Sequence, residues 1–391
     1  MRLIYFAATR MPTEKARGIQ IVKMCEAFTL VNANITNKEK NDANKLKLEV
    51  ELLVPWRFNS IKGDVFQYYG VERNFKVKKL PCLDLVPLDR YLGNFAAWVK
   101  NITFSFSVFF YLLFNKPDII YTRDKFSLYF SLFFKKNFFF EAHTFPKNYF
   151  LYSPFFKRLK KIIVITQKLK NLFIEKGIPE NKILVAPDGV DIEKFDVRCS
   201  KLEAREKLGL PKDKKIVLYT GHLYRWKGVY TLAEASQYLL EDVEIYFVGG
   251  TQKDIENFKN RTSNLKLNII GHRLHKEIPY WLKAVDVLVL PNSAEADISK
   301  FWTSPVKMFE YMASKRPIVA SNISSIREIL NEKNALFFEP DNSKDLAKAI
   351  EKIFQNSELF DGISNQAYID VQNYTWEKRA KRILDFIINF K

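Results

Sequence analysis

Short apolar runs of five to eight residues recur along this chain, and longer segments with apolar residues at helical spacing separate them. In the first half these runs are 2–8, 48–54, 118–122, 137–142, 162–166 and 182–187. In the second half they are 215–221, 243–250, 267–271, 286–291 and 317–321. They are apolar throughout, which is typical of parallel strands covered by helices on both faces. The sequence predicts two doubly wound, Rossmann-like α/β domains that face a cleft.

A charged stretch near residue 197 separates the two series of strands, and the length of 391 residues fits two or three domains. We therefore expect domains at 1–197 and 198–373. The last segment, 374–391, carries apolar residues at helical spacing with Lys and Arg on the other face, which predicts a docked terminal helix.

The chain carries a formal net charge of +18, which indicates an anionic partner such as nucleic acid, anionic lipid or a phosphorylated small molecule. Its three cysteines form no Cys-x-x-Cys pair, so neither a disulfide framework nor a zinc cluster is expected. With no cleavable signal evident, we expect a cytoplasmic protein. A non-catalytic binder of nucleic acid is disfavoured, because the aromatic residues lie in strand-like and apolar helical runs.

The most apolar stretch, 101–115, lies between Lys100 and Lys116 and contains several Ser, Thr and Asn residues. Its 15 residues are fewer than the roughly 20 that span a bilayer. We expect a buried helix that leads into the strand at 118–122. The alternative is a helix that lies partly in a membrane interface.

Ligands of open α/β sheets bind at the carboxyl ends of the strands, so the loops after them are informative. The loop after the run 215–221 contains Arg225 and Lys227, just before a helix expected near Gly228. Two cations beside a helix N-terminus suit a dianion such as a diphosphate. The alternative is a solvated basic loop.

After the run 286–291, a long loop leads to Ser304 and Pro305, which predict a helix N-cap and first helical position. Lys307 falls in the first turn, where a cation opposes the helix dipole, and this suggests a ligand contact. Glu310 follows within an apolar stretch, where its carboxylate could accept from the two hydroxyls of a ribose. The alternatives are a Lys307 that extends into water and a Glu310 that is exposed or ion-paired.

In the first half, the strand 137–142 is followed directly by His143, one of four histidines in the chain. A histidine at this position is a candidate for a polar contact or proton transfer, although a structural role is equally compatible. Gly18 follows the long first loop and permits close backbone approach to a ligand. No P-loop, Gly-x-Ser-x-Gly elbow or Asp-x-Asp pair occurs, so neither a cofactor nor a metal ion is expected.

The order and spacing of these pieces resemble the retaining glycosyltransferases of family 4, which have the two-domain GT-B fold. The resemblance is strongest in YTGHLYRWKG, VEIYFVGG, IPYWLKAVDVLVLPNS and SPVKMFEYMASKRPIVASN. It implies transfer of a sugar from a nucleotide-sugar to an acceptor hydroxyl with retention, in cell-surface polysaccharide or glycolipid synthesis. It also implies an acceptor-binding first domain, a donor-binding second domain, and a terminal helix that crosses back onto the first.

The resemblance carries specific roles onto this sequence. It implies that Arg225, Lys227 and His143 are catalytic. Donor-binding roles fall on Gly18, Gly221, Ser304, Lys307 and Glu310. Two positions depart from the family pattern: His222 replaces the usual Arg, and Trp302 replaces the first of two Glu residues, for which Glu295 or Asp297 could substitute. An oxygen of the departing diphosphate would accept the proton of the acceptor.

Basic runs at 76–79, 135–136 and 157–161 lie in the predicted acceptor domain. They suggest peripheral docking on the anionic inner face of a membrane, where a lipid-linked saccharide acceptor would reside. Two other functions remain open for the sequence. One is a nucleotide-sugar epimerase or hydrolase of the same fold, and the other is the non-catalytic basic binding protein.

Overall fold

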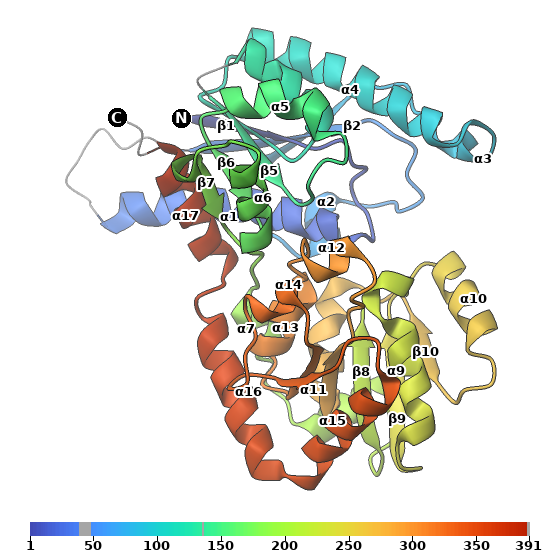
Figure 1. Ribbon diagram of the computed structural model, residues 1–391. Helices are drawn as coiled ribbons and strands as arrows, with labels where there is room; N and C mark the ends of the chain where they lie inside the picture. The colour runs from blue at the N-terminus through green and yellow to red at the C-terminus, as the bar shows by residue number, and fades with distance from the viewer. Residues whose placement is uncertain (39–47, 135–136, 389–391) are drawn as a thin grey trace. The chain divides into compact units, whose positions relative to one another are not determined.

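The computed structural model describes residues 1–38, 48–134 and 137–388, and its internal contacts divide the chain into two units (Figure 1). Unit 1 consists of Met1–Pro187 and Trp376–Lys391, and unit 2 of Asp188–Thr375. The boundary predicted near residue 197 therefore lies inside unit 2. The basic pair at 135–136 lies outside the described residues.

Unit 1 is built on a seven-stranded sheet in the order β3-β2-β1-β4-β5-β6-β7, and every neighbouring pair is parallel. The strands are β1 (Arg2–Phe6), β2 (Glu49–Pro55), β3 (Lys76–Leu80), β4 (Ile119–Thr122), β5 (Phe138–Ala142), β6 (Ile162–Val164) and β7 (Ile183–Val185). Six of them match predicted apolar runs. The exception is β3, an edge strand whose sequence is the basic run at 76–79.

The helices of unit 1 connect and cover these strands. They are α1 (Ala16–Lys38), α2 (Val65–Tyr69), α3 (Asp89–Leu92), α4 (Asn94–Asn115), α5 (Tyr149–Arg158), α6 (Gln167–Glu175) and the terminal helix α17 (Trp376–Ile388). Short 3₁₀ segments include η2 (Lys125–Leu132). Helix α17 packs against α1, which confirms the prediction that the terminal helix crosses back onto the first domain.

Unit 2 repeats the same topology with a six-stranded parallel sheet in the order β10-β9-β8-β11-β12-β13. Its strands are β8 (Lys215–Thr220), β9 (Val243–Val248), β10 (Asn268–Gly271), β11 (Val287–Leu290), β12 (Ile318–Ser321) and β13 (Leu336–Phe338). Five were predicted, and the edge strand β13 was not. In each unit the strand order reverses beside the first strand, at β1/β4 in unit 1 and at β8/β11 in unit 2. Such reversals are where open α/β sheets bind ligands.

The helices of unit 2 bury both faces of its sheet. They are α7 (Ile192–Phe195), α8 (Lys201–Leu208), α9 (Val229–Ala235), α10 (Gln252–Arg261), α11 (Ile278–Ala284), α12 (Asp297–Lys300), α13 (Val306–Ala313), α14 (Ser324–Arg327), α15 (Ser343–Gln355) and α16 (Ser357–Val371). Along β8, Ile216 and Leu218 join one apolar core, whereas Val217 and Tyr219 join the other. This alternation confirms the predicted doubly wound arrangement.

Helix α4 differs from its prediction in length and in burial. It has 22 residues because it begins at Asn94, and by length and composition alone it could cross a membrane. One face packs into unit 1 through Phe104, Val108 and Leu112. The expectation of a buried helix is wrong for the other face, where Phe106, Phe110, Leu113 and Phe114 are exposed.

Candidate active site

The carboxyl end of β8 brings two lysines to one glycine. A Cβ placed on Gly221 would lie 3.7 Å from Nζ of Lys227 and 3.8 Å from Nζ of Lys307. The backbone of Gly221 has φ +125°, a conformation that favours glycine. Lys227 arrives from the loop after β8, and Lys307 from α13. The structure thus brings three predicted site residues together at the strand-order reversal of unit 2.

Two side chains of helix α13, Lys307 and Tyr311, fix it against the end of β8. Nζ of Lys307 donates to the carbonyl oxygen of Thr220 at 3.0 Å and lies 3.5 Å from the centre of the Tyr219 ring. The backbone nitrogen of Thr220 donates to the hydroxyl of Tyr311 at 2.8 Å. The alternative that Lys307 extends into water is therefore ruled out, since its side chain is directed onto the end of β8.

The two ammonium groups are held in an environment that disfavours their charge. Burial lowers the pKa of Lys227 to about 8. Burial, together with the positive charge of Lys227, lowers the pKa of Lys307 well below its usual range. A bound anion would stabilise both cations, so the arrangement suits a phosphate or diphosphate.

Arg225 does not share this position. Its side chain is 72% exposed, and Nη2 lies 3.4 Å from Oε2 of the exposed Glu295. Arg225 instead lines a shallow depression with Tyr224, Trp226 and Arg261. The predicted catalytic pair of Arg225 and Lys227 is thus divided, and Lys307 is the cation that accompanies Lys227.

Ser304 is placed differently from its prediction as a helix N-cap. Helix α13 begins at Val306 with Pro305 in the N-cap position, and no side chain caps it. The hydroxyl of Ser304 instead accepts from the backbone nitrogen of Asp188 at 3.0 Å and is buried. The N-cap assignment is wrong by one residue, because the chain remains extended at Pro305.

Glu310 lies one turn after Lys307 on α13 and is buried, as the apolar sequence around it predicted. Oε1 of Glu310 lies 2.7 Å from Nε2 of His275, which follows β10. The carboxylate is thus anchored through one oxygen. The sequence predicts no role for His275, because no local pattern indicates a contact between residues 35 positions apart.

The positions that bear on the departures from the family pattern also lie in unit 2. Nδ1 of His222 lies 2.9 Å from Oδ2 of Asp254, at the start of α10. Asp297 is the first residue of the short helix α12, and Glu295 precedes it. That Glu295 or Asp297 replaces the carboxylate missing at Trp302 stays a prediction.

In unit 1, His143 lies directly after β5 and contacts Glu141, a buried carboxylate on that strand. The other oxygen of Glu141 accepts from the hydroxyl of Tyr121 on β4. Nη2 of Arg379, on the terminal helix α17, donates to Oε1 of Glu141 at 3.0 Å. Burial alone would raise the pKa of the Glu141 carboxyl, but Arg379 and His143 hold it well below its usual range. His143 therefore lies beside a carboxylate whose charged form Arg379 of α17 helps to stabilise.

Gly18 has a packing role that the sequence did not reveal. It lies in the first turn of α1, and a Cβ there would lie 2.1 Å from the hydroxyl oxygen of Tyr69. Its backbone nitrogen already donates to the carbonyl oxygen of Lys15 at 2.8 Å. The close contact with Tyr69 explains the glycine, and approach to a donor phosphate stays a prediction.

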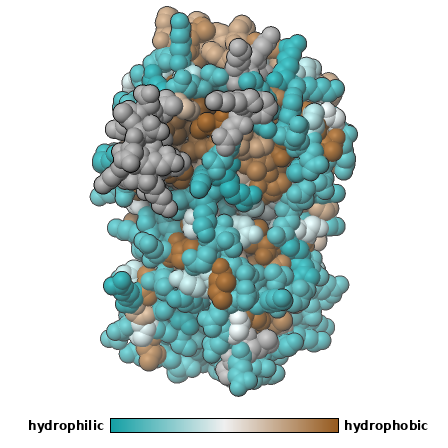
Figure 2. Space-filling view, turned by 90° about the vertical axis from the view of Figure 1, so that its left-hand side faces the viewer, coloured by the Kyte–Doolittle hydropathy of each residue, from teal (hydrophilic) through white to brown (hydrophobic). Residues whose placement is uncertain are grey.

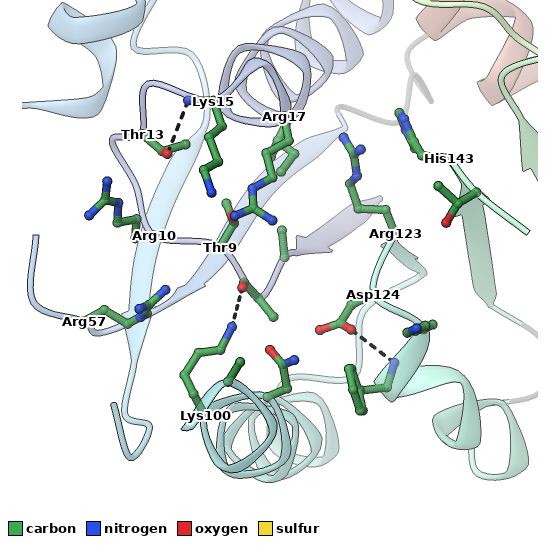
Figure 3. Close-up of a pocket in the computed structure, with 18 of the residues that line it drawn as sticks. Thr9, Arg10, Thr13, Lys15, Arg17, Arg57, Lys100, Arg123, Asp124 and His143 are labelled. Carbon is green, nitrogen blue, oxygen red and sulfur yellow. Dashed lines mark hydrogen bonds between the residues drawn. The ribbon is translucent and has the colours of Figure 1, made fainter. Parts of the chain in front are cut away.

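The strand-order reversal of unit 1 opens into a pocket of about 640 Å³, shown in Figure 3. Its walls come from the loop after β1, the start of α1, helix α4 and the residues after β4 and β5. Of these lining residues, the sequence predicts a site role only for His143. Arg123, which directly follows the predicted strand 118–122, could have been found by the same rule that singled out Arg225.

No group of three or more His, Cys, Asp or Glu side chains within residues 1–38, 48–134 and 137–388 is placed to hold a metal ion. The polar groups at the two strand-order reversals include several cations, Glu310 and the His143–Glu141 pair. Together with two doubly wound parallel sheets, they define a two-domain α/β protein of the GT-B class.

Family models and solved structures agree with this class. A model described as "Glycosyltransferase Family 4" matches residues 64–194, and one described as "Glycosyl transferases group 1" matches residues 214–356. The chain belongs to the family 4 glycosyltransferases, which are also described as group 1. Anabaena HepE, solved in complex with UDP and glucose, superposes with a TM-score of 0.74 at 16% identity over 99% of each chain. WaaG, a glycosyltransferase involved in lipopolysaccharide biosynthesis, gives a TM-score of 0.68 at 14% identity over 99% of this chain and 100% of that one.

Two curated relatives are similar over part of their length. The putative teichuronic acid biosynthesis glycosyltransferase TuaC of Bacillus subtilis is 26% identical over 202 residues, 51% of this chain and 49% of that protein. The UDP-Gal:alpha-D-GlcNAc-diphosphoundecaprenol alpha-1,3-galactosyltransferase of Escherichia coli is 27% identical over 230 residues, 56% of this chain and 57% of that protein. The matched part of the chain thus spans about half the length of these relatives.

Proposed function

We propose that this protein is a retaining glycosyltransferase that moves a sugar from a nucleotide-sugar to an acceptor hydroxyl without a metal ion. The observation that carries the proposal is the convergence of Lys227 and Lys307 on Gly221, with Glu310 one turn further along α13. The lysines would hold the donor diphosphate, and the free oxygen of Glu310 would accept from the ribose.

In the proposed reaction, the bond between the sugar carbon C1 and the diphosphate oxygen breaks as C1 bonds to the acceptor oxygen on the same face. The acceptor proton passes to an oxygen of the departing diphosphate, so no external base or co-reactant is needed. Negative charge grows on that diphosphate, and the two ammonium groups at Gly221 are positioned to stabilise it. His143, oriented by Glu141, would contact the donor sugar.

The donor and acceptor are proposed from the relatives. HepE was solved with UDP and glucose and with UDP-glucose, and the Escherichia coli galactosyltransferase is named for a UDP-Gal donor and a diphosphoundecaprenol-linked acceptor. We therefore favour a UDP-sugar donor, a saccharide or lipid-linked saccharide acceptor, and a role in cell-surface polysaccharide or glycolipid synthesis.

A thermal-shift screen of UDP-, GDP- and dTDP-sugars tests the donor. A nucleotide-sugar at a hundred times its dissociation constant should stabilise the protein by about 2.7 kcal/mol. With the donor that stabilises the protein, proton NMR of the transfer product should show that the sugar keeps the anomeric configuration it had in the donor. The transfer rate should be unchanged by EDTA. Inversion, loss of activity with EDTA, or release of sugar or epimer without any acceptor would contradict the proposal.

We also propose that the protein is cytoplasmic and docks peripherally on an anionic membrane through the exposed face of α3 and α4. This face carries Tyr91, Phe95, Trp98, Phe106, Phe110 and Phe114, which recur at helical spacing and are each more than half exposed. Figure 2 shows apolar side chains gathered at the upper edge of the view, the edge at which α4 and α5 lie in Figure 1. Soluble proteins seldom leave an apolar stripe of this length unpaired.

Basic side chains accompany this apolar face. Lys78 lies with Nζ 4.6 Å from the centre of the Tyr111 ring on α4, and Lys116 directly follows the last residue of that helix. Near an anionic surface each such cation can contribute about 1 kcal/mol to binding. An amphipathic helix flanked by cations suits the interface of an anionic bilayer.

Flotation with phosphatidylglycerol vesicles tests the docking. The protein should float with these vesicles at low salt, and Phe110→Glu should abolish the association. Leu240→Glu, a matched change at an exposed apolar residue of unit 2, should leave it intact. Flotation that is absent at low salt, or equal for the two variants, would end this part of the proposal.

A further inference from the structure

The pocket of unit 1 has an excess of positive charge. Seven Lys and Arg side chains line it, against the two carboxylates of Glu14 and Asp124. They come from separate parts of the chain: the loop after β1, the first turn of α1, the loop after β2, helix α4 and the residues after β4. Figure 3 shows several of these side chains directed into one space. Convergence of cations from five segments is not the property of one basic run.

Arg10 and Arg57 are among the cations of the wall that contact carboxylates of unit 1. Nη2 of Arg10 contacts both carboxylate oxygens of Glu14, at 3.0 and 2.9 Å. Nε of Arg57 donates to Oδ1 of Asp84 at 3.0 Å. The wall also carries Lys15, Arg17, Lys100, Arg123 and Lys125. After Glu14, Asp124 is the remaining carboxylate among the lining residues, so the wall keeps a positive excess.

The inner members of this group have neutral hydrogen-bond acceptors. Nζ of the buried Lys100 donates to the carbonyl oxygen of Ala8 at 2.8 Å, and Nη1 of Arg123 donates to Oε1 of Gln20 at 3.0 Å. Burial and the positive charges of Arg57 and Arg17 lower the pKa of Lys100 to about 8. Neutral partners orient these cations without cancelling their charge, so their mutual repulsion remains.

Uncharged groups complete the pocket wall. Thr9 lines the pocket and is 4% exposed, and its Oγ1 has no hydrogen-bond partner among the described residues. A buried hydroxyl without a partner costs stability unless something in the pocket bonds to it. A hydroxyl donor beside guanidinium and ammonium groups is suited to an oxyanion with several acceptor oxygens.

We propose that this pocket binds the acceptor of the transfer reaction through a phosphate or diphosphate group that the acceptor carries, contacted by Arg17, Lys100 and Arg123. The inference rests on the proposed function, which provides the acceptor, and adds its chemical class. A neutral sugar would leave the positive excess of the wall in place, whereas a phosphate supplies negative charge and accepts bidentate hydrogen bonds from arginine. A carrier lipid and a soluble sugar phosphate share this group, and the experiments below separate them.

Calorimetric titration of the full chain with inorganic pyrophosphate tests the pocket directly. We expect two classes of site. Arg17→Gln and Arg123→Gln should each weaken one class about tenfold or more, whereas Lys227→Ala should weaken only the other. Arg17 is exposed, so its replacement should not impair folding. Arg73→Gln removes an exposed arginine of unit 1 outside the pocket and should titrate like the unchanged protein.

The titration separates this inference from the proposed function. If Arg17→Gln and Arg123→Gln both titrate like the unchanged protein, the phosphate-binding pocket is refuted, whatever Lys227→Ala does. If only Lys227→Ala has no effect, the donor assignment fails and the pocket stands as an anion site.

Acceptor kinetics identify the source of the phosphate. Three acceptors with one sugar are compared: the sugar diphosphate on a short lipid chain, the soluble sugar 1-phosphate, and the neutral methyl glycoside. Arg17→Gln should raise KM about tenfold for the phosphorylated acceptors and leave KM for the donor unchanged. A lower KM for the lipid form assigns the phosphate to a lipid carrier, and equal values assign it to a soluble one. A variant that raises KM equally for the methyl glycoside would overturn the proposal.

Discussion

The two units share one strand order, yet the ligand-facing ends of their sheets carry different chemistry. In unit 2 the β8/β11 reversal holds two lysines beside a single glycine, fixed by a backbone carbonyl and an aromatic ring. In unit 1 the β1/β4 reversal opens into a wide pocket with arginines and lysines from five segments. The topology determines where a ligand binds, and the loops determine which ligand.

The difference also concerns how much each site depends on distant parts of the chain. The lysines of unit 2 are supported by residues of β8 and α13 that contact one another directly. In unit 1, His143 depends on Glu141, and Glu141 depends on Arg379, which is 238 positions further along the chain. The first site is assembled within unit 2 from segments up to 91 positions apart, and the second also needs the terminal helix.

The largest effect is expected from replacing a buried arginine, Arg379 in unit 1 or Arg205 in unit 2. Arg379→Ala leaves the buried Glu141 without its arginine, and Arg205→Ala removes a buried guanidinium that bonds Asp286 and four backbone carbonyls, so each should lower the unfolding free energy by about 3 kcal/mol or more. Urea unfolding measures this. Only Arg379→Ala should also lower turnover per folded molecule, because only Glu141 contacts His143. Arg382→Ala, exposed on the same helix, is the control, and equal turnover in the two buried variants would break the comparison.

The next prediction sharpens the division between Lys227 and Arg225. Lys227→Ala should lower kcat about 100-fold, as loss of one charge-stabilising donor commonly does. Arg225→Ala should have a smaller effect, since its side chain is 72% exposed and lies against Glu295. Steady-state kinetics with the donor found by thermal shift decide this, with the exposed Lys212→Ala as control. A greater loss of kcat for Arg225→Ala than for Lys227→Ala would show that Arg225 is the main cation for the diphosphate.

The pH dependence of nucleotide diphosphate binding follows from the lowered pKa of Lys227. This ammonium is charged below about pH 8 and neutral above it, so affinity should fall by up to about tenfold per pH unit above 8. Lys227→Arg keeps its charge and should move the decline to higher pH. Without ligand the sign reverses: the unfolded lysine binds its proton more tightly, so this group's contribution to stability rises between about pH 8 and 10. Calorimetry at several pH values measures both effects, and a pH-independent affinity would contradict the assignment.

The smallest effect concerns two glycines of unit 2. Gly221→Ala forces a Cβ into φ +125° and should cost about 1–3 kcal/mol in unfolding free energy. Gly362→Ala, inside α16 with open space around it, should instead stabilise by about 0.5–1 kcal/mol. Thermal or urea unfolding gives both values. Destabilisation by the Gly362 variant would show that the helix needs this glycine for another reason.

The central strands could be predicted because each is an apolar run buried on both faces. The two strands that were missed, β3 and β13, lie at sheet edges, although the edge strands β7 and β10 were predicted, and β13 has only three residues. At β3 the sequence KVKKL reads as a basic run, since only Leu80 is buried. A polar or very short edge strand is recognised by its pairing, which is a property of the sheet and not of the segment.

The position of a site candidate could be predicted for some residues that follow a central strand, as with Gly221, Lys227 and His143, and their roles stay predictions. The contacts that fix the site were not, because they join distant positions: His275 with Glu310, and Arg379 with Glu141. The apolar stretch in α4 was read as buried because composition alone cannot tell which face of a helix packs against the protein.

The return of α17 to unit 1 makes the N-terminal unit the last to be finished. During synthesis, the strands of the first sheet leave the ribosome early, but the guanidinium that neutralises Glu141 follows only after all of unit 2 has been translated. Until then the nascent first unit holds a carboxylate in its interior without that guanidinium. A released chain that ends at Thr375 should therefore contain a folded second unit and an incompletely ordered first one.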